Sequence, residues 1–303
     1  MHALDRRNFL QHAATAASVG LAGGKIARAA GGHSSGGHAG FEICAFEKFL
    51  QDLSFDELAD TIQSLGFSGI EATVRNKGHI QPERVEEELP KMVEALQQRG
   101  LEVTIMTSDV LSPDQPLTEK VLRTAASLGI KRYRMGFYFY DLKKPVMEQL
   151  DAIRPAVKEL AAMNREIGVS ALYQNHSDAK FVGATLWDLH RLLEGVSPDE
   201  IACAFDIRHT TIEAGLAWPI LYDIMKPHIG ALFVKDFQWK GKKAQHVPLG
   251  TGRVNPDFFK TVQQDGFNKP ISLHVEYLKK EGTQANIDAL RRDMAVLQDW
   301  LKA

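Results

Sequence analysis

Carboxylates, histidines and lysines stand at or near the ends of short apolar stretches along this chain. The stretch from Pro270 to Tyr277 alternates large apolar residues with Ser272, His274 and Glu276. Because side chains alternate along a strand, the apolar set would share one face and the polar set the other. A carboxylate on a strand that packs on helices by its other face is costly to bury without a partner. We therefore expect Glu276 to meet polar or cationic groups from other strands.

Earlier stretches are built in the same way. By the same alternation, these side chains are expected on the side that Glu276 occupies: Lys48, Glu71, Thr73, Arg75, Arg132, Arg134, Gln174, His176, Asp206 and His274. Histidine exchanges protons near neutral pH, and arginines crowded around a lysine lower its pKa. The types present predict proton transfer, with His176, Lys48, Lys235 or Glu276 as acid and base.

Strand-like and helix-like segments alternate without a break over residues 41–303. The expected strands cover residues 41–47, 69–75, 101–108, 131–139, 169–176, 201–207, 231–237 and 271–277. Strict alternation implies parallel strands with right-handed crossovers, and eight units predict a single-domain (β/α)8 TIM barrel. An open doubly wound sheet is the alternative, but residues 46–50 lack the glycine-rich phosphate turn that follows its first strand. In a barrel all the strands end at one mouth, where catalytic groups lie.

The composition and net charge of the chain limit the classes of partner that it is expected to bind. The chain has 303 residues, 44% of them hydrophobic, and a formal net charge of −2, so nucleic acid is not favoured as a partner. No apolar run approaches the ~20 residues of a membrane span, so no membrane anchor is expected in the mature chain. Cys44 and Cys203 stand in apolar strand-like runs and are expected to be buried free thiols rather than a disulfide or a metal site.

The first residues form a separate element. Arg6 and Arg7 precede a weakly apolar Ala/Gly/Ser stretch that ends in Ala27-Arg28-Ala29, and this resembles a twin-arginine export signal. Residues 1–29 are therefore expected to be a signal peptide, residues 30–40 a flexible Gly/Ser/His leader, and residues 41–303 the barrel. The expected location is the periplasm or another exported compartment.

Several motifs together resemble the sugar isomerase/epimerase branch of the xylose-isomerase-like TIM barrels, over essentially all of residues 41–303. They are Phe-Ser-Gly-Ile-Glu (67–71), Gln-Asn-His (174–176), Phe-Asp-Ile-Arg-His (205–209), Val-Lys-Asp (234–236), Pro-Leu-Gly-Thr-Gly-Arg-Val (248–254) and Glu276. The resemblance implies a divalent metal, often Mn²⁺, held by a Glu of strand five, an Asp of strand six, a His of strand seven and a Glu of strand eight. The two Glu residues then move a proton through an enediolate.

Carried to this chain, the metal ligands are Asp206, Glu276 and Gln174. Gln174 stands where the family has Glu, and Phe233 where it has His. A glutamine has no accessible proton equilibrium, so Gln174 cannot be a general base. The oxygen ligands that remain suit Mn²⁺ or Mg²⁺, bound more weakly than in the relatives.

The predicted function is an exported sugar isomerase or epimerase that acts on a small sugar or keto-glycoside through an enediolate. Catalysis is assigned to Glu276, His176, Lys48 and Lys235, and substrate binding to Glu71, Arg75, His79, Arg134, Asn175, His209 and His246. The loss of the strand-five Glu leaves two alternatives: a lyase that acts by β-elimination on keto-glycosides, and a non-catalytic sugar-binding barrel with an eroded metal site. An apurinic endonuclease is least favoured, and a homo-oligomer is left open.

Overall fold

Eight parallel strands close into a barrel in the order β1-β10-β7-β6-β5-β4-β3-β2. The computed structural model describes residues 40–278 and 281–302, so the expected signal peptide and, apart from Gly40, the leader lie outside the described residues. The barrel strands are β1 (Ile43–Phe46), β2 (Gly69–Thr73), β3 (Glu102–Thr107), β4 (Arg132–Arg134), β5 (Ser170–Gln174), β6 (Ile201–Asp206), β7 (Ile229–Val234) and β10 (Ile271–Leu273). The predicted single-domain (β/α)8 barrel is confirmed.

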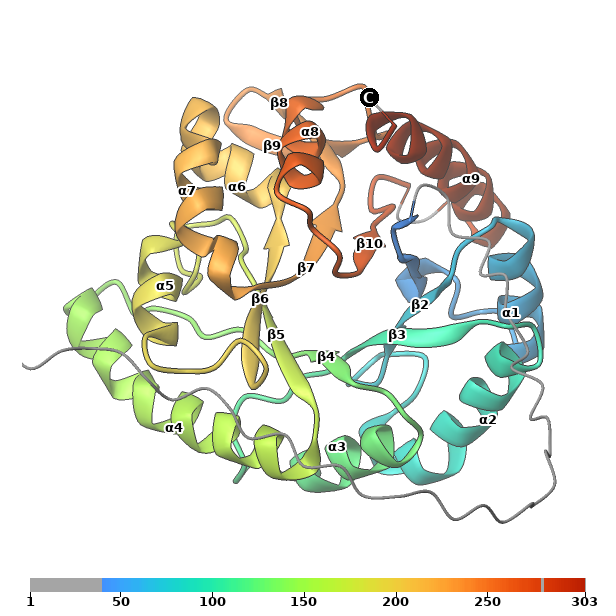
Figure 1. Cartoon of the computed structure of the whole chain (residues 1–303), viewed down its shortest axis with the longest axis horizontal. Helices are drawn as coiled ribbons and strands as arrows, with labels where there is room; N and C mark the ends of the chain where they lie inside the picture. The colour runs from blue at the N-terminus through green and yellow to red at the C-terminus, as the bar shows by residue number, and fades with distance from the viewer. Residues whose placement is uncertain (1–39, 279–280, 303) are drawn as a thin grey trace, which may run out of the picture. The chain divides into compact units, whose positions relative to one another are not determined.

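Helices surround this ring of strands on its outer side (Figure 1). The α-helices are α1 (Phe55–Ser64), α2 (Val85–Gln97), α3 (Thr118–Ser127), α4 (Val146–Ile167), α5 (Trp187–Leu193), α6 (Ile207–Ala214), α7 (Trp218–Met225), α8 (Asp257–Gln264) and α9 (Thr283–Trp300). Short 3₁₀ turns are η2 (Glu47–Phe49), η3 (Pro82–Arg84), η4 (Gly215–Ala217) and η5 (Lys226–His228). Helix α1 begins with a capping box, in which Ser54 and Glu57 satisfy each other's backbone N–H groups. None of the helices in the described ranges is both long and apolar enough to cross a membrane.

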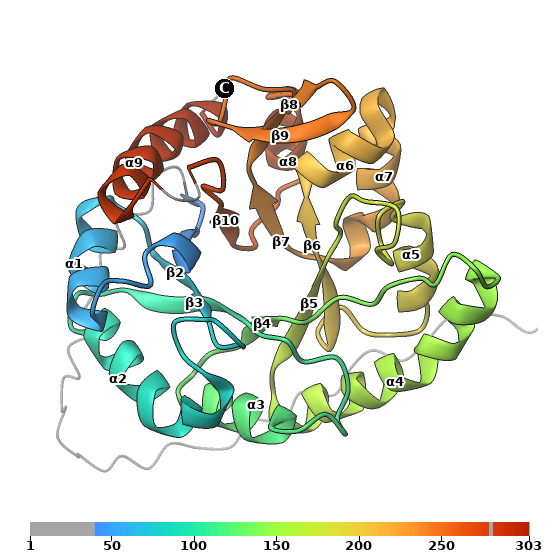
Figure 2. The same cartoon turned by 180° about the vertical axis from the view of Figure 1, so that it is seen from behind.

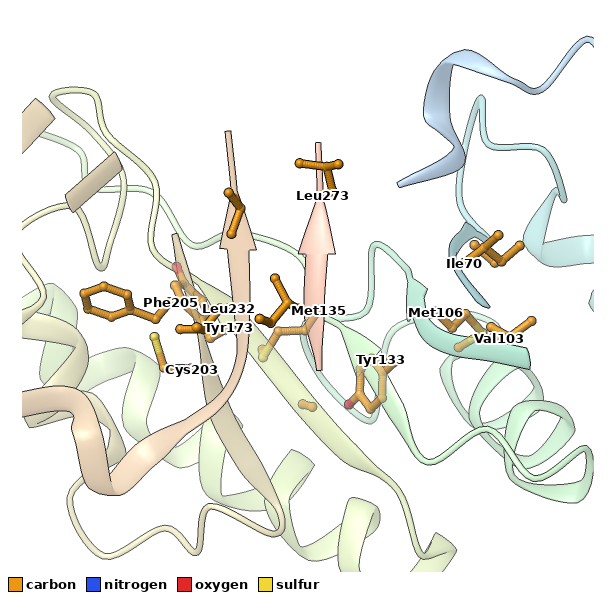
Figure 3. Packing of buried hydrophobic residues seen from close by; sticks show 14 of the residues in the cluster. Ile70, Val103, Met106, Tyr133, Met135, Tyr173, Cys203, Phe205, Leu232 and Leu273 are labelled. Carbon is orange, nitrogen blue, oxygen red and sulfur yellow. The ribbon is translucent and has the colours of Figure 1, made fainter. Parts of the chain in front are cut away.

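The apolar core has two layers that follow the alternation along the strands. The outer layer lies between strands and helices and includes Ile70, Tyr133, Phe205 and Leu232 (Figure 3). The inner layer fills the barrel itself and consists of Cys44, Ile105, Leu172, Ala202, Ala204, Ala231 and Phe233. Each large apolar side chain buried in this way contributes roughly 1.5–3 kcal/mol. Cys44 and Cys203 are buried and free, as predicted.

The strands are shorter than expected, and this changes where two site residues stand. Strand β10 ends at Leu273, so Glu276 lies in the loop beyond it, and β5 ends at Gln174, two residues before His176. Between β6 and β7 the chain forms two α-helices: α6 starts immediately after Asp206, and α7 follows η4.

A two-stranded antiparallel hairpin, β8 (Asp236–Lys240) and β9 (Lys243–Val247), follows β7, so the end of the expected strand 231–237 belongs to this hairpin. It lies beside α6 and α8 at one side of the barrel (Figure 2). Its base is fixed by the buried Asp236 carboxylate, which accepts backbone N–H groups of Phe237, Gly250, Gly252, Arg253 and Val254 at 2.8–3.1 Å. A Cβ at Gly252 would stand 2.2 Å from Asp236 Oδ1, so only glycine allows this contact. Asp236 thus anchors both the hairpin and the following glycine-rich turn.

Candidate active site

Three inward carboxylates define the mouth of the barrel: Glu71 on β2, Asp206 at the end of β6 and Glu276 after β10. The side chains of Glu71 and Asp206 are 0% exposed, whereas that of Glu276 is 16% exposed. Glu276 lines a cavity of about 530 Å³, together with Lys240, Lys243, Ala244, Gln245, His246 and Tyr277. Of the three carboxylates, Glu276 is therefore the one that a ligand in this cavity can contact.

Lys235 joins two of these carboxylates. Its Nζ lies 3.2 Å from Asp206 Oδ2 and 2.9 Å from Glu276 Oε1, and the side chain is 5% exposed. Burial alone would lower the pKa of Lys235, but the two carboxylates outweigh burial and raise the pKa above its ordinary value. Lys235 is thus a permanent cation, which does not suit the general-base role considered from the sequence. The same alternation that buries Phe233 inside the barrel brings Lys235 to its mouth.

Asp206 uses both carboxylate oxygens inside the protein. Oδ1 accepts the backbone N–H of His209 at 3.1 Å, which makes Asp206 the N-cap of α6. Oδ2 accepts from Gln174 Nε2 at 2.8 Å in addition to its ion pair with Lys235. The backbone of Asp206 is also held, since its N–H donates to Asn175 Oδ1 at 2.7 Å. Asn175 is 0% exposed, so its place is behind the site rather than at the substrate surface expected for it.

The Gln174 amide presents its nitrogen, not its oxygen, to Asp206. Its Oε1 accepts a hydrogen bond from Arg134 Nη1 at 3.0 Å, and Arg134 has only donors. Asp206 has only acceptors, so the two neighbours fix the orientation of the amide. Phe233, at the position of the family histidine, is 0% exposed and packs 4.7 Å from the His274 ring. The residues present therefore do not fit the divalent metal that the resemblance implied, and no group of three or more metal-ligating side chains is found within residues 40–278 and 281–302.

His274 bridges the remaining two carboxylates. Its Nε2 lies 2.9 Å from Glu71 Oε2 and its Nδ1 lies 3.5 Å from Glu276 Oε1, while the ring stacks on Phe46 at 4.4 Å. Glu71 also accepts from Ser272 Oγ at 2.6 Å and from the Thr107 hydroxyl. Glu71 thus holds His274 in place from inside the barrel.

The surroundings of these two carboxylates keep both ionised. Burial alone would raise the pKa of Glu71, but the charge and hydrogen bond of His274 and the charge of Arg134 lower it to about 2. Burial likewise would raise the pKa of Glu276, yet Lys235, His274 and Lys48 hold it well below its usual range. Glu71 is fully buried and completely hydrogen-bonded, so it positions His274 and has no surface for the sugar contact expected from the sequence.

Lys48 is the more accessible cation beside Glu276. Its Nζ lies 3.7 Å from Glu276 Oε2, and its side chain is 37% exposed. Burial lowers its pKa, and the nearby charges of Arg75, Lys235 and Arg134 add to the effect, whereas Glu276 opposes it. A lysine whose pKa is lowered in this way can exchange protons closer to neutral pH. Arg75 itself is half-buried and acts on the site by its charge.

His176 and His209 form a tilted ring pair next to the ion pairs, with ring centroids 3.9 Å apart. Burial and the charge of Lys235 lower the pKa of His176 to about 4, so the ring is neutral at pH 7. Its Nδ1 meets Ser177 O at 2.8 Å, and since a carbonyl accepts, the proton is on Nδ1 and Nε2 carries the lone pair. His209 is 2% exposed, and its Nδ1 accepts from Ser177 N at 3.1 Å. His209 therefore supports the site from below and does not line it.

Two parts of the site were missed by the sequence alternation. Glu47, 0% exposed, accepts the backbone N–H of Thr73 at 2.7 Å and faces His79 Nδ1 at 3.2 Å. It was not among the side chains expected to face inward, which include its neighbour Lys48, and the 3₁₀ turn η2 interrupts the strand alternation at this point. Arg208 was not singled out, although its Nη1 lies 3.1 Å from His209 Nδ1 and its Nη2 donates to Ala244 O in β9.

The remaining two predicted site residues, His79 and His246, have different surroundings. His79 is largely covered, with 10% of its side chain exposed, and packs on the Phe55 ring at 5.1 Å. His246 lines the cavity from β9, and burial followed by the charge of Arg208 lowers its pKa to about 3. The structure thus brings Glu276 and His246 to the cavity, pairs Lys48 and Lys235 with Glu276, and buries Glu71, Asn175, Asp206 and His209. Their roles in catalysis and binding stay predictions.

Solved structures with the same fold come from several bacteria. A candidate xylose isomerase from Rhodospirillum rubrum has 18% identity over 87% of this chain and 99% of its own, with a TM-score of 0.68. The 3-keto-D-glucoside 4-epimerase YcjR from E. coli has 15% identity over 84% of this chain and 99% of its own, with a TM-score of 0.65. A xylose isomerase-like TIM barrel protein from Mycobacterium smegmatis, in complex with magnesium, has 16% identity over 86% and 98%, with a TM-score of 0.60.

At these identities the likeness concerns the fold. No curated protein matches the sequence significantly. The family profile described as xylose isomerase-like TIM barrel matches residues 59–300, from within α1 to the end of α9, which is most of the chain. The chain belongs to the xylose isomerase-like TIM barrel family.

Proposed function

We propose that this protein is a carbohydrate enzyme of the isomerase/epimerase type, which moves a proton at the carbon next to a sugar carbonyl. The observation that carries the proposal is the pairing of Glu276, the cavity-facing carboxylate, with two ammonium groups, Lys235 at 2.9 Å and Lys48 at 3.7 Å. A carboxylate can accept the proton that leaves carbon, and cations beside it stabilise the enolate oxygen that forms. Solved relatives of the fold include a 3-keto-D-glucoside 4-epimerase.

The proposed reaction uses Glu276 and Lys48 as base and acid. Glu276 is ionised at neutral pH because its neighbours hold its pKa low, so it is ready to take the proton from the carbon atom. The C–H electron pair then moves onto the carbonyl oxygen, where Lys48 donates a proton and Lys235 contributes a fixed positive charge. For an isomer, Glu276 delivers the proton to the former carbonyl carbon, while the hydroxyl group of the carbon first deprotonated loses its proton to Lys48 and becomes the new carbonyl. For an epimer, solvent supplies a proton to the other face of the carbon first deprotonated, the enol O–H proton returns to Lys48, and Glu276 releases the abstracted proton to solvent.

A second candidate, β-elimination from a keto-glycoside, is favoured by one specific observation. Gln174 stands where a second carboxylate would exchange protons from the other side of the substrate, and its amide is fixed by Arg134 and Asp206. With one base in place, the enolate can expel a leaving group on the adjacent carbon instead of being reprotonated. Both reactions share the first step, removal of the proton next to the carbonyl.

The shared step can be measured before the product is known. Free ketoses and 3-keto-glycosides are incubated with the protein in D₂O, and proton NMR follows loss of the signal at the carbon next to the carbonyl. We expect exchange that Glu276→Gln abolishes and that Glu281→Gln, an exposed matched control, leaves unchanged. New isomers in the same spectra indicate isomerisation or epimerisation, and release of the aglycone indicates elimination. Exchange that survives in Glu276→Gln would refute the assignment, and sugar binding without exchange would favour the non-catalytic barrel.

We also propose that the chain is exported through the twin-arginine pathway, as the paired Arg6 and Arg7 before an Ala/Gly/Ser stretch suggest. Replacing both arginines by lysine should retain the protein in the cytoplasm of a bacterial host. Cell fractionation of wild type and the double variant tests this, and equal amounts in the periplasm would contradict it.

A further inference from the structure

We propose that the Lys235 ammonium takes the place of the divalent cation, so that this barrel carries its site cation as a side chain and binds no metal there. The proposal concerns occupancy of the site and stands without the proposed function. Only the use of this cation to stabilise an enolate depends on that function.

The Lys235 ammonium lies between the two carboxylates that match metal ligands of the family. Asp206 and Glu276 are the two residues that match metal ligands of the family, and Lys235 Nζ contacts both of them, at 3.2 and 2.9 Å. A Mg²⁺ or Mn²⁺ ion bound by the same two oxygens would lie about 2.0–2.2 Å from each. That point lies in the space between the carboxylates that the ammonium already fills, and the two cations would repel each other strongly at such a distance.

The position of the Lys235 ammonium is fixed by its burial and by the register of its strand. The Lys235 side chain is 5% exposed and extends from the end of β7, whose register with β6 and β10 is fixed by the barrel. Val234, the residue before it, packs in the outer core layer. Moving Lys235 out of the way would leave the buried Asp206 without its cation, which is costly when one partner of a buried pair is removed.

The other two ligand positions have lost the ability to hold a metal. Gln174 directs its N–H₂ group at Asp206 and its oxygen at Arg134, so no lone pair of this amide points to the site. Phe233 offers no donor atom and belongs to the apolar layer inside the barrel. Asp206 Oδ1 is engaged as the helix cap of α6. The lost ligand positions and the Lys235 ammonium therefore surround the same point in space.

An ammonium differs from a metal ion in what it offers a substrate. It has one positive charge and three N–H donors. Asp206 and Glu276 account for two donors, and no third acceptor for Lys235 Nζ is found among residues 40–278 and 281–302. One N–H thus remains for a single substrate oxygen, whereas a metal ion would chelate two adjacent oxygens. The inferred ligand class is a sugar with one carbonyl or oxyanion to bind, rather than a chelating pair.

Metal content and thermal shift test the proposal without any activity assay. Wild-type protein purified without chelator is analysed for Mn, Mg, Zn, Fe and Ca, and its melting temperature is then followed during titration with MnCl₂ and MgCl₂. We expect substoichiometric metal and no saturable shift. Stoichiometric Mn²⁺ or another divalent metal that EDTA removes with a fall in melting temperature would overturn the proposal.

A reconstructed site gives the converse test. Lys235→Met combined with Gln174→Glu and Phe233→His should gain a saturable Mn²⁺-dependent rise in melting temperature and a bound-Mn²⁺ signal in electron paramagnetic resonance. Lys260→Met, at an exposed position of α8, is the matched control and should show neither. If the triple variant does not fold, Lys235→Met with Gln174→Glu is titrated in its place. A folded variant without Mn²⁺ binding would overturn the assignment of this point as the cation position.

Discussion

Glu71 offers the clearest quantitative test of the charge arrangement at the barrel mouth. This carboxylate is fully buried between His274, Arg134, Ser272 and Thr107, and its pKa is lowered to about 2 from an ordinary value of 4.5. Between these two pH values the unfolded chain binds more protons at this position than the folded chain does. The stabilisation from Glu71 is therefore complete above about pH 5 and is lost as the pH falls toward 2.

The size of the stability change follows from the difference between the folded and unfolded pKa of Glu71. A difference of one pKa unit corresponds to about 1.4 kcal/mol, so the full pH-dependent contribution of Glu71 is about 3 kcal/mol, of which about 2 kcal/mol is lost by pH 3. The Glu71→Gln variant has no carboxylate here and cannot show this component. At neutral pH it should be less stable by about 3–5 kcal/mol, because the replacement leaves the buried His274 and Arg134 without their anion.

Urea unfolding of both proteins, followed by circular dichroism from pH 7 to pH 3, measures these quantities. The difference in unfolding free energy between wild type and Glu71→Gln should shrink by about 2 kcal/mol over this range. Glu83→Gln, at an exposed position of η3, serves as the control and should keep a constant difference from wild type. A difference between wild type and Glu71→Gln that stays constant with pH would refute the reasoning about the Glu71 environment.

Three further outcomes are expected. Gly252→Ala should lower the unfolding free energy by about 2–4 kcal/mol in urea, because its Cβ would stand 2.2 Å from Asp236 Oδ1; a loss below about 1 kcal/mol would contradict this. If Lys48 is the acid, the D₂O exchange rate should fall with rising pH at a pKa below the ordinary 10.5, and Lys48→Arg should move this fall to higher pH; an unchanged profile would exclude Lys48. His176→Phe keeps an aromatic ring at this position. As the pH falls from 6.5 to 4, wild type should lose more stability than this variant, because the unfolded chain binds a proton at His176 that the folded chain, with a pKa of about 4, does not. Equal losses in thermal melts would argue against a neutral buried ring.

The alternation of apolar and polar residues was sufficient to predict the barrel and most of its mouth. Ser272 and His274 face inward and Leu273 faces outward, as the period of two requires, and the same rule places Gln174 and Asp206 inside. These positions were predictable because a strand buried on both faces leaves each side chain only two directions.

The failures occur where the chain leaves the ladder. Glu47 turns inward because η2 follows β1 directly, and Asp206 starts α6 with its own carboxylate. Neither event has a periodic signal in the sequence. Alternation alone does not place Lys235, because both faces of residues 231–237 mix apolar and charged groups. Only the register with β6 and β10 decides that Phe233 and Lys235 face inward. The pairing of β7 with β6 and β10, and not the local sequence pattern, therefore fixes the position of the Lys235 ammonium.

The net charge of the site links the two departures from the family pattern, Gln174 and Phe233, to the Lys235 ammonium. In the pattern that the resemblance implies, two Glu and one Asp around a divalent ion sum to one negative charge, with histidine neutral. Here Asp206 and Glu276 around the Lys235 ammonium also sum to one negative charge, because Gln174 has removed one carboxylate. An ammonium in place of the metal while Glu stayed at position 174 would have left an extra buried anion, which is strongly unfavourable. The glutamine and the lysine therefore form one electrostatic unit, and Phe233 closes the space that a histidine ligand no longer needs.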